Sequence, residues 1–197
     1  MISQRMAPNV DALHLVRGQI LPRLPGLLRS STFWLSVASA ILLTLVAQHT
    51  PFGTLSIREV IDGTLTYASI SLGACVSATV LALGLPGTER IRRWSTVSGS
   101  TPGMSLLSDL VFVLTWAALA QIALILTCVV SLVLGGELPI APRDWKETHA
   151  IGLLAGSIAF FYALFQLLVV VQTLLQIGVV VIAEENADQT TVAFDDR

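Results

Sequence analysis

Four long apolar runs, separated by proline, glycine and charged residues, make up most of this chain. They lie at about residues 33–48, 63–85, 106–134 and 150–182. Because the hydrocarbon layer of a bilayer is roughly 30 Å thick, a helix needs about 20 apolar residues to cross it. The last three runs reach that length, and the first is shorter. The pattern predicts an integral membrane protein whose surroundings are a lipid bilayer.

The composition agrees with this prediction. Hydrophobic residues make up 54% of the chain and charged residues only 12%, with a mean hydropathy of +0.78, whereas soluble domains are about 25% charged. No ionised side chain lies deep within a run, and Asp109 stands only near the start of the third. The alternative, a soluble helical bundle, would carry charge along the outer face of each helix.

The expected fold is therefore all-α and polytopic: four transmembrane helices in an antiparallel bundle. The bundle occupies residues 31–183, with spans at about 32–49, 63–85, 106–134 and 150–182. A short amphipathic segment, residues 1–30, precedes it. An acidic tail, residues 184–197, follows it.

Capping signals mark the ends of these helices. Serines are placed to cap the first and third helices at Ser30 and Ser105. Ser56 and Glu59 form a capping box, in which each side chain bonds the backbone amide of the other, so the second helix should begin near Ile57. A second box, 144–147, predicts a fourth helix from Trp145 to about residue 185. That helix would be about 60 Å long at 1.5 Å per residue, so it should tilt or project from the membrane.

The first 30 residues have a helical pattern of their own. Val10, Leu13, Val16 and Ile20 recur at helical spacing. This predicts a short amphipathic helix on the inner membrane surface, with its arginines at the lipid headgroups and with Pro22 and Pro25 breaking it. A loosely ordered tail is the alternative.

The distribution of Lys and Arg predicts the orientation. Eight of these residues fall in the N-terminal segment, the second loop and the tail, and three fall in the other two loops. Both termini should therefore be cytoplasmic. Arginine outnumbers lysine ten to one, which favours a GC-rich bacterium and its plasma membrane. The short first run also fits a signal peptide cleaved after Ala47, which would leave three spans.

Small residues mark the faces where membrane helices touch. In the second helix, Ser69, Gly73 and Ser77 belong to one stripe that runs from Asp62 to Gly84. The opposite side is also small. A helix that is small on two sides should be the most buried of the four.

In the fourth helix, Gly152 and Gly156 form a GxxxG pair at the edge of a face that also carries Gln166. We expect this face to contact protein and the opposite side, which includes Phe160, to contact lipid, although a GxxxG pair also serves packing within one chain. Gln121 lies at mid-depth in the third helix. Its amide needs a partner there, for which Gln166 or a hydroxyl of the second helix is the candidate.

Reactive chemistry is sparse. Asp62 stands at a predicted membrane edge, where it would charge a helix start or, in a pore, form an acidic outer mouth. Asp144, Glu147 and His149 are too weak a set to predict a metal site. We expect no cofactor and no catalytic residues. There is no basic arm to suggest nucleic acid.

Two functions fit these features. The first is a non-catalytic membrane protein that acts as an accessory, assembly or self-associating subunit, whose partner is another membrane protein or a second copy. The alternative is a small channel or permease subunit for a small neutral solute or ion, with the polar stripe of the second helix lining the path.

Overall fold

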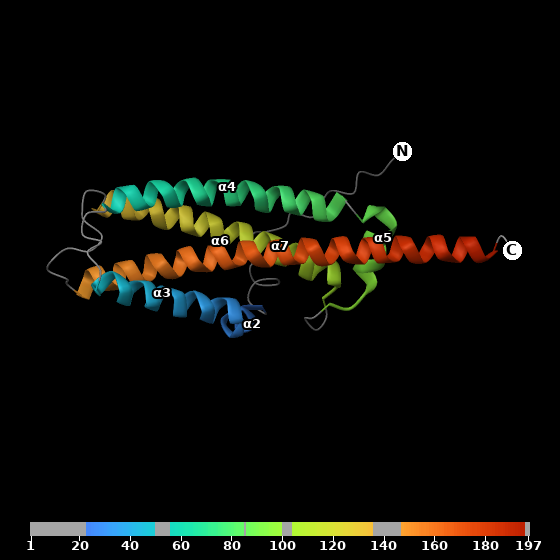
Figure 1. The fold of residues 1–197 in the computed structure, drawn as a ribbon, viewed down its shortest axis with the longest axis horizontal. Helices are drawn as coiled ribbons and strands as arrows, with labels where there is room; N and C mark the ends of the chain where they lie inside the picture. Colours follow the sequence, from blue (N-terminus) through green and yellow to red (C-terminus); the bar gives the residue numbers. More distant parts are fainter. Residues whose placement is uncertain (1–22, 50–55, 85, 100–103, 136–146, 196–197) are drawn as a thin grey trace, which may run out of the picture.

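The computed structural model describes residues 23–49, 56–84, 86–99, 104–135 and 147–195, and no strand occurs in these ranges. The helices in chain order are α2 (Leu24–Arg29), α3 (Ser31–His49), α4 (Ile57–Gly84), α5 (Gly87–Thr96), α6 (Leu106–Gly135) and α7 (Glu147–Asp195) (Figure 1). Ser98 and Ser105 form an isolated antiparallel bridge.

Three helices are long and apolar enough to cross a membrane. Their apolar stretches are Arg58–Gly84 in α4, Leu106–Val133 in α6 and Ala150–Ala183 in α7. These confirm the predicted membrane-length helices for three of the four runs. The apolar part of α3, Ser31–Ala47, is shorter, so its role as a fourth span stays a prediction.

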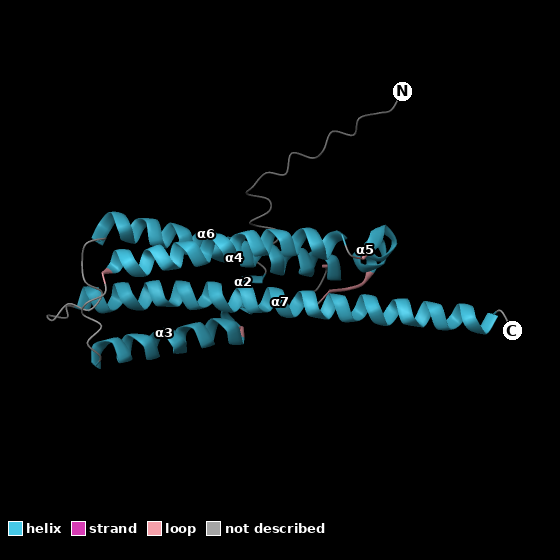
Figure 2. Cartoon of the chain, turned by 45° about the horizontal axis from the view of Figure 1, so that its top comes forward, coloured by secondary structure: helices cyan, strands magenta, loops and turns pink. Residues whose placement is uncertain are grey.

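The long helices pack side by side: α3 and α6 run opposite to α4 and α7, so α4 and α7 run in the same direction (Figure 1). α3 packs along α7, α7 along α6 and α6 along α4, and α4 also contacts α7. Figure 2 shows α3 on the side of α7 away from α4 and α6. The start of α6, the end of α4 and helix α5 all lie toward the end of the molecule to which α7 extends.

Two groups of buried residues hold these helices together. Ile61 and Ala68 of α4 pack with Leu124 and Cys128 of α6 and Ala163 of α7. The second group joins α4, α5, α6 and α7, and consists of Cys75, Ala78, Ala82, Trp94, Leu110, Leu114, Ala117, Val170 and Ile177. Alanine and cysteine supply three of the five residues of the first group and four of the nine of the second, and such small side chains let helix backbones approach closely.

The predicted caps are present. The Ser56 amide donates to Glu59 Oε2 (2.9 Å) and the Glu59 amide donates to Ser56 Oγ (3.3 Å), which starts α4 at Ile57 as expected. Ser105 Oγ accepts the amide of Ser108 at the start of α6, and Ser30 Oγ accepts the amide of Phe33 at the start of α3. Helix ends were therefore readable from local sequence.

Other features differ from the predictions. α7 runs for 49 residues to Asp195, about 74 Å, and so continues into the predicted acidic tail. Pro25 lies in the first turn of α2 and begins that helix rather than breaking one, because its missing amide is not needed there. The proposed amphipathic helix before Pro22 and the 144–147 box lie outside the described residues.

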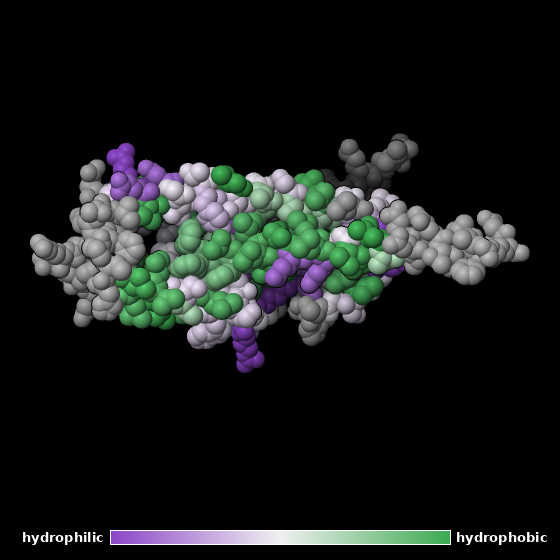
Figure 3. Space-filling view, in the orientation of Figure 1, coloured by the Kyte–Doolittle hydropathy of each residue, from purple (hydrophilic) through white to green (hydrophobic). Residues whose placement is uncertain are grey.

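We expected the second predicted span, α4, to be the most buried of the four helices, and the structure contradicts this. α4 and α6 bury the same share of their apolar windows, 28%, and α7 buries 17%. Only one of the two small faces of α4 is used inside this chain. Large apolar side chains are exposed along all four long helices, among them Leu42, Val76, Val133 and Val179, and they form much of the green surface in Figure 3.

Candidate functional site

The outward face of α4 carries the small residues that the sequence pattern singled out. Ser69, Gly73 and Ser77 are all exposed, and so are Asp62 and Thr66 nearer the start of the helix. The opposite side of α4 faces the other helices, and its buried residues are Ile61, Ala68, Ser71, Cys75, Ala78 and Ala82. At 100° per residue the two sets lie on opposite sides of the helix. We call the exposed set, residues 62, 66, 69, 73 and 77, the small face of α4.

Nothing in the described chain requires the small face to be small. A Cβ atom built on Gly73 would meet no heavy atom within 4 Å. Glycine inside a helix costs about 1 kcal/mol relative to alanine, and internal packing does not recover that cost here. The position leaves room for the close approach of another helix.

The serine hydroxyls on this face also have no partner in the part of the chain that the structure describes. The hydroxyl of Thr66 donates to the carbonyl of Asp62 one turn earlier, and that of Thr79 donates to Cys75. No such bond is found for Ser69 or Ser77 within the described ranges. In hydrocarbon, a hydroxyl gains from any donor or acceptor that a neighbouring helix brings.

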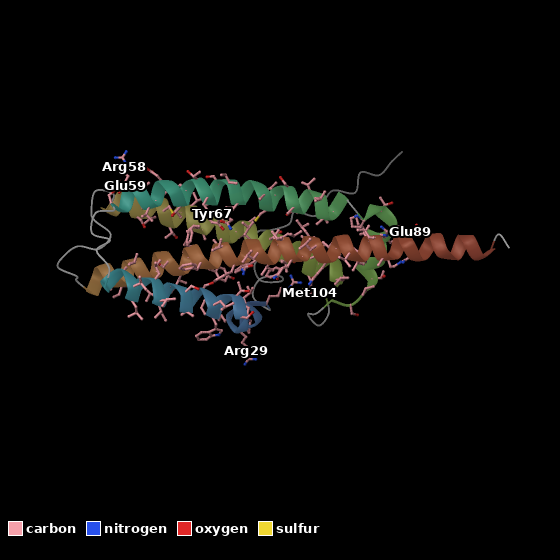
Figure 4. The ribbon with its side chains drawn as sticks, viewed as in Figure 1. Arg29, Arg58, Glu59, Tyr67, Glu89 and Met104 are labelled. Atoms are coloured by element: carbon pink, nitrogen blue, oxygen red, sulfur yellow. The ribbon has the colours of Figure 1, made fainter. Side chains whose placement is uncertain are left out.

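Asp62 lies one turn beyond the capping box of α4 and is exposed. Glu59 supplies the acidic cap of this helix (Figure 4), so Asp62 is not needed for that task. Asp62 is therefore the first residue of the small face, at the end nearest the start of α4.

The glycine pair of α7 is open as well. A Cβ atom on Gly152 or Gly156 would meet no heavy atom within 4 Å, and Gly152 is exposed. Gln166, on the same predicted face, is 5% exposed, and Ala163 is fully buried. The predicted protein face of α7 is therefore packed near its middle and open near its start. Phe160, which we expected on the lipid side, instead packs on Tyr67 of α4, with ring centroids 5.5 Å apart.

Gln121 is fully buried and joins α6 to α7. Its Nε2 donates to the backbone carbonyl of Ala163 (2.9 Å). The expected partner, Gln166 or an α4 hydroxyl, was wrong, because the backbone of α7 comes close enough at Ala163 to accept this bond directly. Gln121 Oε1 is buried and has no hydrogen-bond partner among the residues that the structure describes.

A polar and aromatic chain of contacts ties α2 to α6 and α7. Arg23 forms an ion pair with Asp109, and its guanidinium lies 4.2 Å from the ring centroid of Phe112. The Phe112 ring stacks on Trp116, whose Nε1 donates to Tyr162 Oη (2.7 Å). We had expected Arg23 to meet lipid headgroups. The two charges are 86 positions apart in sequence, and no local pattern could have paired them.

A groove lies between α3 and α6, with α7 as its floor. Its volume is about 510 Å³ and its lining is almost entirely apolar. Phe33 of α3 forms one wall and Trp116 of α6 the other, while Leu27 and Leu28 of α2 lie at one end. No sequence pattern indicated this groove, because it depends on α3 and α6 packing on the same helix without packing on each other.

Groups that could react or bind metal are few in the described ranges. Cys75 and Cys128 are free thiols and both are buried. No group of three or more His, Cys, Asp or Glu side chains is placed to hold a metal ion among the residues described. His149 and Asp144 fall outside the side chains that the structure describes.

Comparison with protein-family models, with curated proteins and with solved structures gave no match to this chain.

Proposed function

We propose that this chain is a non-catalytic, multi-pass protein of a bacterial plasma membrane that acts as an accessory, assembly or self-associating subunit. Another helix, from a second copy or from a different membrane protein, packs on the small face of α4. The observation that carries the proposal is Gly73, which stands in the middle of that face with open space around it.

The proposed topology has four spans and both termini in the cytoplasm. α3 is 19 residues long, about 28 Å, which is close to the hydrocarbon thickness. The Arg23–Asp109 ion pair brings the N-terminal segment to the start of α6, and α5, with Arg90, Arg92 and Arg93, contacts both α4 and α6. Arg23 and α5 thus both lie beside the start of α6, and basic residues on one side of the membrane are what the positive-inside rule favours.

Association through α4 is favoured over further internal packing. Lipid tails are as apolar as leucine, so membrane helices associate through close contact of small residues and through interhelical hydrogen bonds. The small face supplies both, with Gly73 for close approach and the Ser69 and Ser77 hydroxyls for bonding. The large apolar side chains on α3 and α6 supply neither and suit lipid.

The test compares the particle mass of purified protein in mild detergent for the wild type, Gly73→Leu and Gly63→Leu. Gly63 is the matched control, since it is also exposed on α4 with no heavy atom within 4 Å of its Cβ position but lies off the small face. We expect the wild type and Gly63→Leu to exceed the 21.0 kDa of one chain, through a second copy or a co-purified protein. Gly73→Leu should stay folded and run as one chain.

A single-chain wild type in both detergent and cross-linked membranes would refute this proposal. Unfolding caused by Gly73→Leu would also contradict it, because that result would place Gly73 in the core of the protein.

A channel or permease for a small neutral solute or ion is the second candidate. It is favoured by the polar character of the small face, where Asp62, Thr66, Ser69 and Ser77 would line a path between copies. Solute flux into vesicles that Ser69→Leu abolishes, with assembly intact, would support this candidate over the first.

A further inference from the structure

The groove between α3 and α6 is built as a binding site, and it is separate from the small face of α4. α3 and α6 both pack on α7 and make at most a marginal contact with each other. Ala155 and Ala159 lie on the α7 floor, and Ala120 and Ala123 lie on the α6 wall. Short side chains on the floor keep the groove open, and α4 contributes nothing to its lining.

The groove runs along the helices from the α2 end, at the level of Tyr162, toward Ala155 and the start of α7. Leu27 and Leu28 lie at the α2 end. On α6 the lining continues from Trp116 to Leu124, eight positions, or about 12 Å of helix. The ion pair of Arg23 with Asp109 holds α2 against α6 at this end.

Arg29 indicates that the α2 end of the groove lies at the depth of the lipid headgroups. It follows directly on Leu28, is exposed, and projects away from the other helices (Figure 4). Among the described residues it has neither a hydrogen bond nor an ion pair. A guanidinium is too costly to leave in hydrocarbon and reaches for the headgroups. Trp34, 61% exposed, lies about one turn further on, as an interfacial aromatic does.

The size of the groove argues against a helix as its occupant. A helix about 10 Å across and 20 residues long fills more than roughly 2,000 Å³, whereas the groove offers about 510 Å³. Sites for small ligands span about 300–1,000 Å³. A flexible apolar chain fits these dimensions, and the membrane supplies one.

We propose that this groove binds one acyl chain of an anionic membrane phospholipid, whose phosphate group meets Arg29. The chain runs from the headgroup level at Leu28 past Phe33 and Trp116 to the alanine floor. A basic side chain near the membrane surface favours anionic over zwitterionic lipid by about fivefold.

Native mass spectrometry of the delipidated full-length protein tests this proposal, with phosphatidylglycerol and phosphatidylcholine titrated separately. We expect one phosphatidylglycerol to bind with about fivefold higher affinity than phosphatidylcholine. Arg29→Gln should remove that preference and Arg29→Lys should keep it. Ala123→Phe, which fills the groove from an exposed position, should abolish the tight site.

Ala38→Phe is the matched control, since Ala38 is exposed on α3 and lies outside the groove; it should bind lipid as the wild type does. Equal affinity for the two lipids in the wild type, or tight binding that survives Ala123→Phe, would overturn the proposal. None of these substitutions lies on α4. A negative result here would therefore refute lipid binding in the groove without bearing on helix association through the small face of α4.

A second measurement does not depend on the groove variants. The protein for this measurement keeps Trp116 and has its other tryptophans replaced by phenylalanine. In nanodiscs, phosphatidylglycerol with brominated acyl chains should quench Trp116 fluorescence more than its mole fraction among the lipids would predict. Quenching no greater than that by brominated phosphatidylcholine would contradict an anionic lipid in the groove.

Discussion

Replacing Gln121 by leucine removes one hydrogen bond and one unpartnered oxygen in the same step. The amide nitrogen donates to the Ala163 carbonyl at 2.9 Å, and the amide oxygen is buried with no partner in the described part of the chain. Interhelical hydrogen bonds in membranes are worth about 0.6 kcal/mol on average and up to about 1.7. A buried, unsatisfied polar atom costs about 1–3 kcal/mol. The stabilisation lost with the hydrogen bond and the penalty removed with the unpartnered oxygen are opposite in sign and similar in size.

We therefore expect Gln121→Leu to leave stability unchanged or to raise it by up to about 2 kcal/mol. Leucine has nearly the volume and helix propensity of glutamine, and Ala163 keeps the ordinary helical bond of its carbonyl. Gln121→Ala should instead lower stability by about 2 kcal/mol, since it leaves a cavity between α6 and α7.

The assay is reversible unfolding of the purified protein in mixed micelles with increasing SDS. Gln172→Leu is the control, because Gln172 is exposed on α7 and its replacement should change stability by no more than about 0.5 kcal/mol. A loss of more than about 2 kcal/mol for Gln121→Leu would refute the reasoning. It would mean that the amide oxygen is bonded by water or by another chain, and that Gln121 belongs to a polar path.

Three further predictions concern the helix ends and the open glycines. Arg23→Gln removes the ion pair with Asp109 and should cost about 3 kcal/mol, seen as faster tryptic cleavage in α2; an unchanged rate would mean that another contact holds this helix. Gly152→Ala and Gly156→Ala should each stabilise the protein by about 0.5–1 kcal/mol, which is measured as a higher midpoint of thermal unfolding. A lower midpoint would show that the space beside that glycine is already filled. Ser56→Ala should cost about 1 kcal/mol and speed hydrogen exchange in the first turn of α4, while unaltered exchange would argue that the cap is not formed.

Local sequence was sufficient for the starts of α3, α4 and α6. The box at Ser56 and Glu59 formed as expected, because capping depends only on residues within one turn. The three membrane-length helices also follow from apolar length alone.

The choice of face on α4 could not be made from sequence. Both sides of this helix are small, and in lipid no hydrophobic difference separates an inward side from an outward one. Only the positions of α6 and α7 show that Cys75 and Ala78 are buried while Gly73 is exposed. Burial of α4 was overestimated for this reason.

Contacts between distant segments were also missed. Arg23 and Asp109 each had a plausible local role, at a headgroup and at a helix start, and only the fold brings them together. The amphipathic helix α5 was not expected either. It contains Trp94, which is 7% exposed and packs in the core beside the start of α6, although its ten residues lie in what looked like a charged loop.

The central claim is that lipid surrounds these helices and that the small face of α4 is kept for another helix. Nitroxide labels at residues 69, 73 and 77, compared with labels at lipid-exposed Leu42 and Leu126, test it directly in reconstituted bilayers after Cys75 and Cys128 are replaced by alanine. We predict slow label motion and low oxygen access on the small face, with fast motion and high oxygen access at Leu42 and Leu126. Equal motion and equal oxygen access at all five positions would contradict a packed face, and high access of a water-soluble nickel reagent at Leu42 and Leu126 would contradict the membrane itself.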